Sequence, residues 1–221
     1  AIFGNTALFG GGLYNKTDGT ASVTNGAQVY QNSASDDGGG VYNLGALTVS
    51  DSTFSANMAA QDGGGVFNAA GGTLDVINST LFGNSATNNG GGIFNTNATL
   101  NMSGGVLSGN SATTYNGGGL YNEKSGLVTV TNGAQVKQNL ASDDGGGVYN
   151  GSGLTVSNGA QIEQNSAGDG GGVFNLGKLT ASDSTISNNT ASDDGGGVYN
   201  GAGGTLGATN STLSGNTATI L

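Results

Sequence analysis

The sequence predicts an all-β protein folded as a parallel β-helix of about eight coils, with three short strands per coil. Three observations support this prediction. Two short motifs recur in phase along the chain, glycine supplies 46 of the 221 residues and opposes helix, and short segments of alternating polarity lie between clusters of turn-forming residues. A propeller blade or a leucine-rich repeat would need a different period and motif.

The first motif is a glycine triplet followed by an aliphatic residue, an aromatic residue and Asn. Its eight copies are 25 to 28 residues apart and start at Gly10, Gly38, Gly63, Gly90, Gly117, Gly145, Gly170 and Gly195. The second motif is Asn-x-Ala, preceded at the third position by an aliphatic residue or Phe. Its nine asparagines are Asn5, Asn32, Asn57, Asn84, Asn110, Asn139, Asn165, Asn189 and Asn216. Random low complexity would not keep two motifs in phase, so residues 1–221 are predicted to form one β-helix domain.

Each period contains three strand-like segments. They are the glycine-triplet segment, an alternating stretch such as Leu47–Ser50, and a third stretch such as Thr53–Asn57. Coils stacked at the strand spacing of about 4.8 Å would make a rod about 40 Å long. Coils of two or four strands remain alternatives to three.

The motifs also predict which side chains face the interior. Leu47 and Val49 should point inward and Thr48 outward. The aliphatic residue after each triplet should point inward, which places the neighbouring aromatic residues in an outward stacked row; the opposite phase remains open. The motif asparagines are expected to form a ladder of amides that closes a bend. The ladder residues are Asn43, Asn68, Asn95, Asn122, Asn150, Asn175 and Asn200.

Composition excludes several function classes. The chain has 14 acidic residues, four lysines and no arginine, so its net charge of −10 opposes nucleic-acid binding. No apolar run approaches the roughly 18 residues of a membrane-spanning helix. Histidine and cysteine are absent, which removes the commonest general base and the strongest nucleophile. The sequence therefore predicts a protein that is not an enzyme and needs no cofactor.

Acidic residues before the glycine triplets suggest one alternative. If the coils are in register, these carboxylates lie in a column, and a calcium ion could relieve their repulsion. The residues are Asp37, Asp62, Asp144, Asp169 and Asp194. The competing interpretation is that they shape solvated turns. A calcium-dependent, polysaccharide-acting β-helix enzyme would also need a basic residue beside such a cluster, but Lys16, Lys124, Lys137 and Lys178 are scattered.

The paired motifs resemble the repeats of polymorphic outer-membrane proteins and related bacterial autotransporter adhesins. The family pattern of GGA plus an aliphatic residue appears here as GGG plus Val, Ile or Leu, and its Phe-x-x-Asn pattern is literal only at Phe54–Asn57. The resemblance implies a right-handed β-helix outside a bacterial cell or on its surface, with an adhesive or scaffolding role. No signal peptide or barrel domain is visible and Ala1 enters in mid-repeat, so a processed or excised segment is expected.

Two kinds of partner are expected. The chain opens and closes on the same motif, so its end coils could stack head to tail on a second copy and make a fibre. The residues at these ends are Ile2, Phe3, Asn5, Leu213 and Asn216. The other expected partner is a repetitive extracellular surface or polymer, which an adhesin stalk would contact many times. Ice binding is a further alternative, because Thr and Ser recur on the second segment, as at Thr48, Ser50, Thr155 and Ser157.

Overall fold

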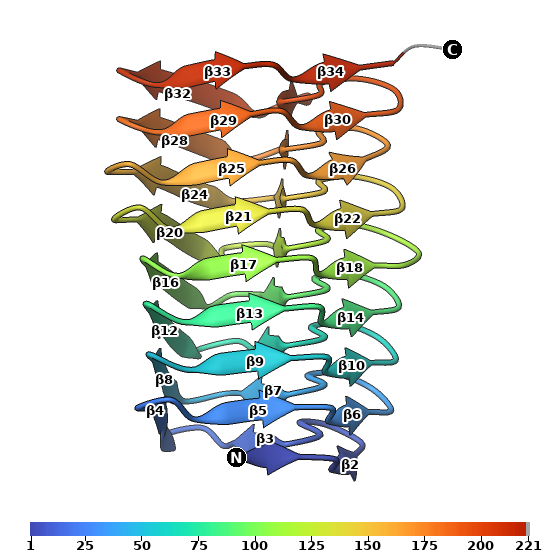
Figure 1. Ribbon diagram of the computed structural model, residues 1–221, viewed down its shortest axis with the longest axis vertical. Helices are drawn as coiled ribbons and strands as arrows, with labels where there is room; N and C mark the ends of the chain where they lie inside the picture. Colours follow the sequence, from blue (N-terminus) through green and yellow to red (C-terminus); the bar gives the residue numbers. More distant parts are fainter. Residues whose placement is uncertain (220–221) are drawn as a thin grey trace.

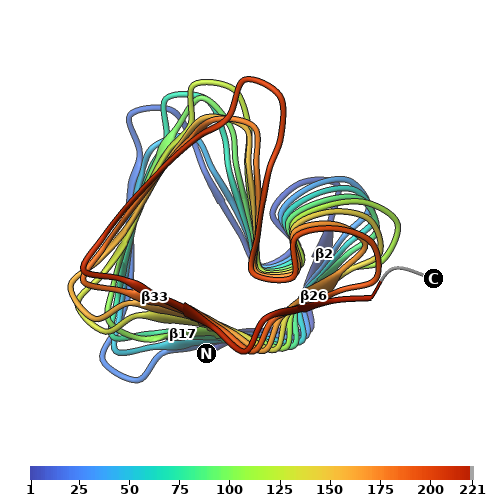
Figure 2. The same ribbon diagram turned by 90° about the horizontal axis from the view of Figure 1, so that it is seen from above.

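The computed structural model describes residues 1–219; residues 220 and 221, the last two of the expected domain, lie outside the described residues. The described chain is a stack of coils made only of strands and turns (Figure 1). Every strand pairs in parallel with strands one coil away. Seen from above, the chain runs anticlockwise while it rises towards the viewer, so the β-helix is right-handed (Figures 1 and 2). The predicted fold is confirmed.

The strands form four parallel sheets, two of eight strands and two of nine. Sheet 1 carries the aromatic motif: β3 (Leu13–Asn15), β7 (Val41–Asn43), β11 (Val66–Asn68), β15 (Ile93–Asn95), β19 (Leu120–Asn122), β23 (Val148–Asn150), β27 (Val173–Asn175) and β31 (Val198–Asn200). Sheet 2 has the longest strands: β4 (Thr20–Thr24), β8 (Ala46–Ser50), β12 (Thr73–Ile77), β16 (Thr99–Ser103), β20 (Leu127–Thr131), β24 (Gly153–Ser157), β28 (Lys178–Ser182) and β32 (Thr205–Thr209).

Sheets 3 and 4 complete each coil. Sheet 3 contains β1 (Ile2–Phe3), β5 (Gln28–Tyr30), β9 (Thr53–Ser55), β13 (Thr80–Phe82), β17 (Val106–Ser108), β21 (Gln135–Lys137), β25 (Gln161–Glu163), β29 (Thr185–Ser187) and β33 (Thr212–Ser214). Sheet 4 contains β2 (Thr6–Ala7), β6 (Ser33–Ala34), β10 (Met58–Ala59), β14 (Ser85–Ala86), β18 (Ser111–Ala112), β22 (Leu140–Ala141), β26 (Ser166–Ala167), β30 (Thr190–Ala191) and β34 (Thr217–Ala218).

The number of strands per coil differs from the expected three. The third predicted segment ends at Ser55, and a fourth strand begins at Met58. Between them Ala56 has a φ of 51°, a left-handed conformation that turns the chain. The equivalent residues Gln31, Gln138 and Gln164 also have positive φ. This corner makes four strands per coil, with a two-residue strand as the fourth.

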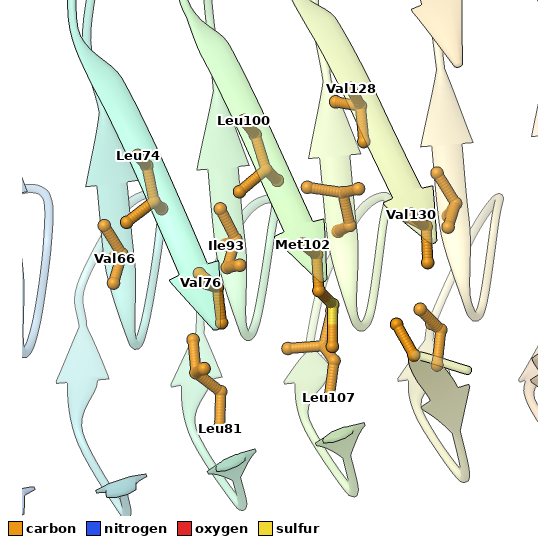
Figure 3. Packing of buried hydrophobic residues seen from close by; sticks show 14 of the residues in the cluster. Val66, Leu74, Val76, Leu81, Ile93, Leu100, Met102, Leu107, Val128 and Val130 are labelled. Carbon is orange, nitrogen blue, oxygen red and sulfur yellow. The ribbon is translucent and has the colours of Figure 1, made fainter. Parts of the chain in front are cut away.

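One continuous hydrophobic core lies inside the coils. Val66 from sheet 1, Leu74 and Val76 from sheet 2, and Leu81 from sheet 3 converge in it, and the next coil repeats this arrangement with Ile93 (Figure 3). The aliphatic residue of each motif therefore points inward, as predicted, and Leu47 and Val49 are also buried. Each coil supplies only a few side chains, and stacking makes the core continuous.

The glycine triplet brings two parts of each coil into close contact. In the triplet at Gly90, the first glycine has a φ of 64°. A Cβ on the middle glycine, Gly91, would strike the backbone of Ser111 in sheet 4. The chain therefore passes directly against sheet 4 before it enters sheet 1. This contact separates a larger three-sided part of the cross-section from a smaller lobe, on the right in Figure 2.

Candidate functional site

The expected asparagine ladder of sheet 1 is present. In each coil the side-chain Nδ2 donates to the Oδ1 of the equivalent asparagine in the next coil; for example, Asn68 donates to Asn95 at 2.8 Å and Asn95 donates to Asn122 at 2.9 Å. Asn95 also donates to the carbonyl of Ala98, which closes the turn between sheets 1 and 2. The remaining bonds join Asn15, Asn43, Asn122, Asn150, Asn175 and Asn200.

A second asparagine ladder runs along the corner before sheet 4. Asn84 donates to the Oδ1 of Asn110 from both its backbone N (3.0 Å) and its Nδ2 (2.9 Å). The same pair of bonds connects Asn110 to Asn139. Among residues 1–219, every buried side-chain nitrogen or oxygen has a hydrogen-bond partner. The asparagines of both ladders therefore have a structural role.

The aromatic row lies on the outer side of sheet 1. Its rings stack coil on coil, with centroids 4.8 Å apart between Phe67 and Phe94 and 4.5 Å apart between Tyr121 and Tyr149. Tyr14 at the first coil is 43% exposed, whereas Phe67 is only 8% exposed. The row is outside the main core, as predicted, but its middle forms a small second cluster with side chains such as Ala69. It is a packed ladder with a partly exposed edge.

The five predicted acidic residues lie in one column on the loops that lead from sheet 4 to the triplets. Asp37 accepts the backbone N–H of Asp62 at 3.1 Å, and Asp62 accepts that of Asn89 at 2.9 Å. Asp169 accepts the backbone N–H of Asp194 at 2.7 Å. The backbones of Asp144 and Asp169 form an isolated parallel β-bridge, which aligns these two residues in neighbouring coils. The column is therefore a third ladder, in which an Asp or Asn oxygen in one coil holds the backbone of a neighbouring coil.

Burial changes the acidity of this column. It raises the pKa of Asp37 to about 6, and the nearby carboxylates of Asp62 and Asp36 add to the effect. Burial also raises the pKa of Asp144 to about 6, with further contributions from Asp143 and Asp169. The pKa of Asp62 is raised by burial too, although its hydrogen bonds from Asn89 oppose the shift.

The column does not gather into a metal cage. Among the described residues, no group of three or more His, Cys, Asp or Glu side chains is placed to hold a metal ion. The carboxylates are instead distributed along the rod, and three of them accept backbone N–H groups. This arrangement matches the turn-shaping interpretation. Calcium binding by Asp37, Asp62, Asp144, Asp169 and Asp194 stays a prediction.

The outer face of sheet 2 is rich in hydroxyl groups. Thr129, Thr155 and Thr180 are aligned in adjacent strands, and a row of Thr131, Ser157 and Ser182 lies on one side of them. The rows are interrupted, for example by Asp75 and Ile77 in β12. The ice-binding alternative rests on this face and stays a prediction that thermal hysteresis would test.

The end residues continue the ladders of the interior coils. Phe3 stacks on Tyr30 at 5.0 Å, and Asn5 donates to Asn32 at 2.9 Å. Leu213 pairs with Ile186, and Asn216 accepts a bond from Asn189 at 3.0 Å. Ile2 pairs with Val29 and packs against the core. The end residues therefore occupy the same structural positions as their interior counterparts.

One feature of sheet 2 was missed by the sequence analysis. A hollow of about 330 Å³ opens on its outer face over β20, β24 and β28. Leu127, Gly153 and Lys178 line one row of it, and Thr129, Thr155 and Thr180 line the next. The signal was present in the sequence, because Gly153 interrupts a row that has a side chain in every other coil.

Comparison with known families gives one match. Residues 183–201 match the Chlamydia polymorphic membrane protein repeat. This stretch contains both motifs, from Ile186-x-x-Asn189 to Gly195–Asn200, and the other coils repeat them. The chain thus carries repeats of the polymorphic outer-membrane-protein type, as the resemblance predicted. No curated protein and no solved structure matches the chain. The described residues include no helix that is long and apolar enough to cross a membrane.

Proposed function

We propose that this β-helix is a non-enzymatic, adhesin-like repeat protein displayed at a bacterial cell surface. The observation that carries the proposal is the polymorphic-membrane-protein repeat at residues 183–201, set in a rod whose coils all share its two motifs. Along the axis of such a rod, each coil exposes an equivalent set of outward side chains. Many weak contacts to a repetitive extracellular surface or polymer would then add up to firm attachment.

The chemistry of the described residues supports a non-catalytic role. The asparagines at the repeated corners are buried and bonded to one another. The carboxylates are spread along a column, so a calcium-dependent enzyme on polysaccharide is the weaker alternative. Its test is cleavage of an acidic polysaccharide that stops when calcium is chelated.

The adhesin proposal is tested by labelling intact cells of the source organism with antibodies against the folded protein. Fab fragments from these antibodies are then added to a cell-adhesion assay. We expect labelling without permeabilisation and reduced adhesion, with Fab fragments against an unrelated surface protein as the control. Labelling only after permeabilisation would contradict surface display, and unchanged adhesion would contradict the adhesive role.

A head-to-tail fibre is a second candidate function, because the end coils present unpaired strand edges beside apolar side chains. Leu206 and Leu213 at one end are 39% and 46% exposed, and their counterparts Leu179 and Ile186 one coil inward are buried. A further coil of the same kind, from the same polypeptide or from a second copy, would cover them. Negative-stain electron microscopy at rising concentration tests this. Filaments with an axial repeat near 40 Å support stacking, and isolated short rods at every concentration contradict it.

A further inference from the structure

Gly153, like Gly207 in β32, is a glycine that the backbone does not require. It has no positive φ, and a Cβ placed on it would meet only a flexible methyl group of Leu127, at 3.0 Å, and the carbonyl of Gly126, at 3.8 Å. The middle glycine of each triplet, by contrast, lies against backbone. Other coils place Ala46, Thr73, Thr99, Leu127 or Lys178 at this position. The fold would accept a side chain at residue 153.

The hollow of about 330 Å³ lies over Gly153, between Leu127 and Lys178. This volume is at the lower end of the range of small-molecule sites. The Leu127 side chain is 59% exposed and gives the hollow an apolar wall. Opposite it stands Lys178, one of only four lysines in a chain of net charge −10.

Three threonines border the hollow in successive strands, in the register Thr129, Thr155, Thr180. Within the part of the chain that the structure describes, neither their hydroxyls nor the Lys178 ammonium has a hydrogen-bond partner. The hollow thus combines three hydroxyls that donate and accept, one ammonium that donates, and one apolar surface. A sugar ring presents hydroxyls at its edge and C–H groups on its face, and a sugar acid adds a carboxylate.

We propose that this hollow, lined by Leu127, Gly153 and Lys178 and by Thr129, Thr155 and Thr180, binds a sugar-acid residue of a glycan. The Leu127 side chain packs on the apolar face of the ring, the threonines bond its hydroxyls, and Lys178 pairs with its carboxylate. The proposal refines the adhesin function by naming a ligand class, and it rests on that function for its biological setting. Binding itself depends only on the hollow.

The test is a titration of the ¹⁵N-labelled full chain with D-glucuronate and, separately, with D-glucose, followed by amide NMR shifts. We expect shifts concentrated at the hollow and binding of glucuronate about tenfold tighter than that of glucose, a ratio typical of one added charge-assisted contact. Gly153→Thr places the residue most common in its row inside the hollow, where it obstructs the ring, and should abolish both titrations. Lys178→Gln should remove the preference for glucuronate and leave glucose binding unchanged.

Thr73→Ala, in the same row three coils away, is the matched control and should leave both titrations unchanged. Shifts of equal size along the whole hydroxyl face, or unchanged binding by Gly153→Thr, would overturn the proposal. If Gly153→Thr does not fold, as its amide spectrum would show, Lys178→Gln and Thr155→Val decide the question. Cell adhesion by folded Gly153→Thr separates the two proposals: adhesion that persists while sugar binding is lost leaves the adhesin function standing with a different contact surface.

Discussion

Asn110 offers the sharpest test of whether the buried amide ladders stabilise the rod. Its Oδ1 accepts the backbone N–H and the Nδ2 of Asn84, and its Nδ2 donates to the carbonyl of Leu81 at 3.1 Å and to Asn139 at 3.0 Å. Asn110→Ala removes all four bonds and leaves the backbone N–H of Asn84 buried without an acceptor. The orphaned N–H costs about 1–3 kcal/mol and each of the other three lost bonds costs about 1 kcal/mol, so the free energy of unfolding should fall by about 4–6 kcal/mol.

The assay is equilibrium urea unfolding followed by circular dichroism, with the slope checked for a change in cooperativity. Asn101→Ala is the matched control, because Asn101 belongs to the same coil but is exposed and makes one surface bond to Asp75. It should change stability by less than about 0.5 kcal/mol. Since a solenoid can open locally, amide hydrogen exchange at Ala86 and Ala112 gives a second readout. A loss below about 1 kcal/mol for Asn110→Ala would refute the energetic argument.

Three further predictions concern the backbone and the acidic column. Gly91→Ala should disrupt folding because the added Cβ meets the backbone of Ser111. The Cβ added by Gly207→Ala meets no atom within 4 Å, so this variant should keep its melting temperature, and thermal unfolding of the two variants tests the difference. Ala56→Gly should stabilise the protein by about 1 kcal/mol, since Ala56 has a φ of 51°, and an unchanged or lower melting temperature would contradict this. The pKa values of Asp37 and Asp144 lie near 6, above the ordinary 3.8, so the folded state binds more protons and stability should rise as pH falls from about 7 to about 4. Asp144→Asn should flatten part of that urea-measured pH profile; a full-sized pH dependence in this variant would show that other groups cause it.

The coil, its core and its ladders could be predicted because each depends on a residue type that recurs at one position. An inward Val, Ile or Leu follows every glycine triplet, so only one register buries the apolar row, and that register aligns the asparagines. The fourth strand could not be predicted in this way. The corner that creates it has a positive φ in every coil, but no single residue type marks it: it is Gly or Asn in five coils and Gln31, Ala56, Gln138 or Gln164 in the other four.

The acidic column shows a second limit of sequence reasoning. Its alignment follows from the repeat spacing, but the hydrogen bonds that hold it depend on the height of each loop relative to the next coil. Asp62 accepts from the backbone of Asn89 in the neighbouring coil, a contact that links residues 27 positions apart. The position of each loop relative to the next coil therefore decides whether a carboxylate faces a cation, water or an N–H group. The spacing of the acidic residues in the sequence is the same in all three cases.

In a repeat protein, a residue that differs in type from its counterparts in the other coils needs an explanation beyond the repeat itself. Some departures have a local reason: Lys137 and Glu163 replace serines in sheet 3, but they lie side by side in adjacent strands, where opposite charges attract. The row of Leu127, Gly153 and Lys178 has no such charge pair: a Cβ on Gly153 would meet only a flexible methyl group of Leu127, and an exposed leucine beside a lysine stabilises little. Three consecutive departures that together form a hollow are therefore better explained by a ligand than by folding, and this is why the glycan test belongs at this site.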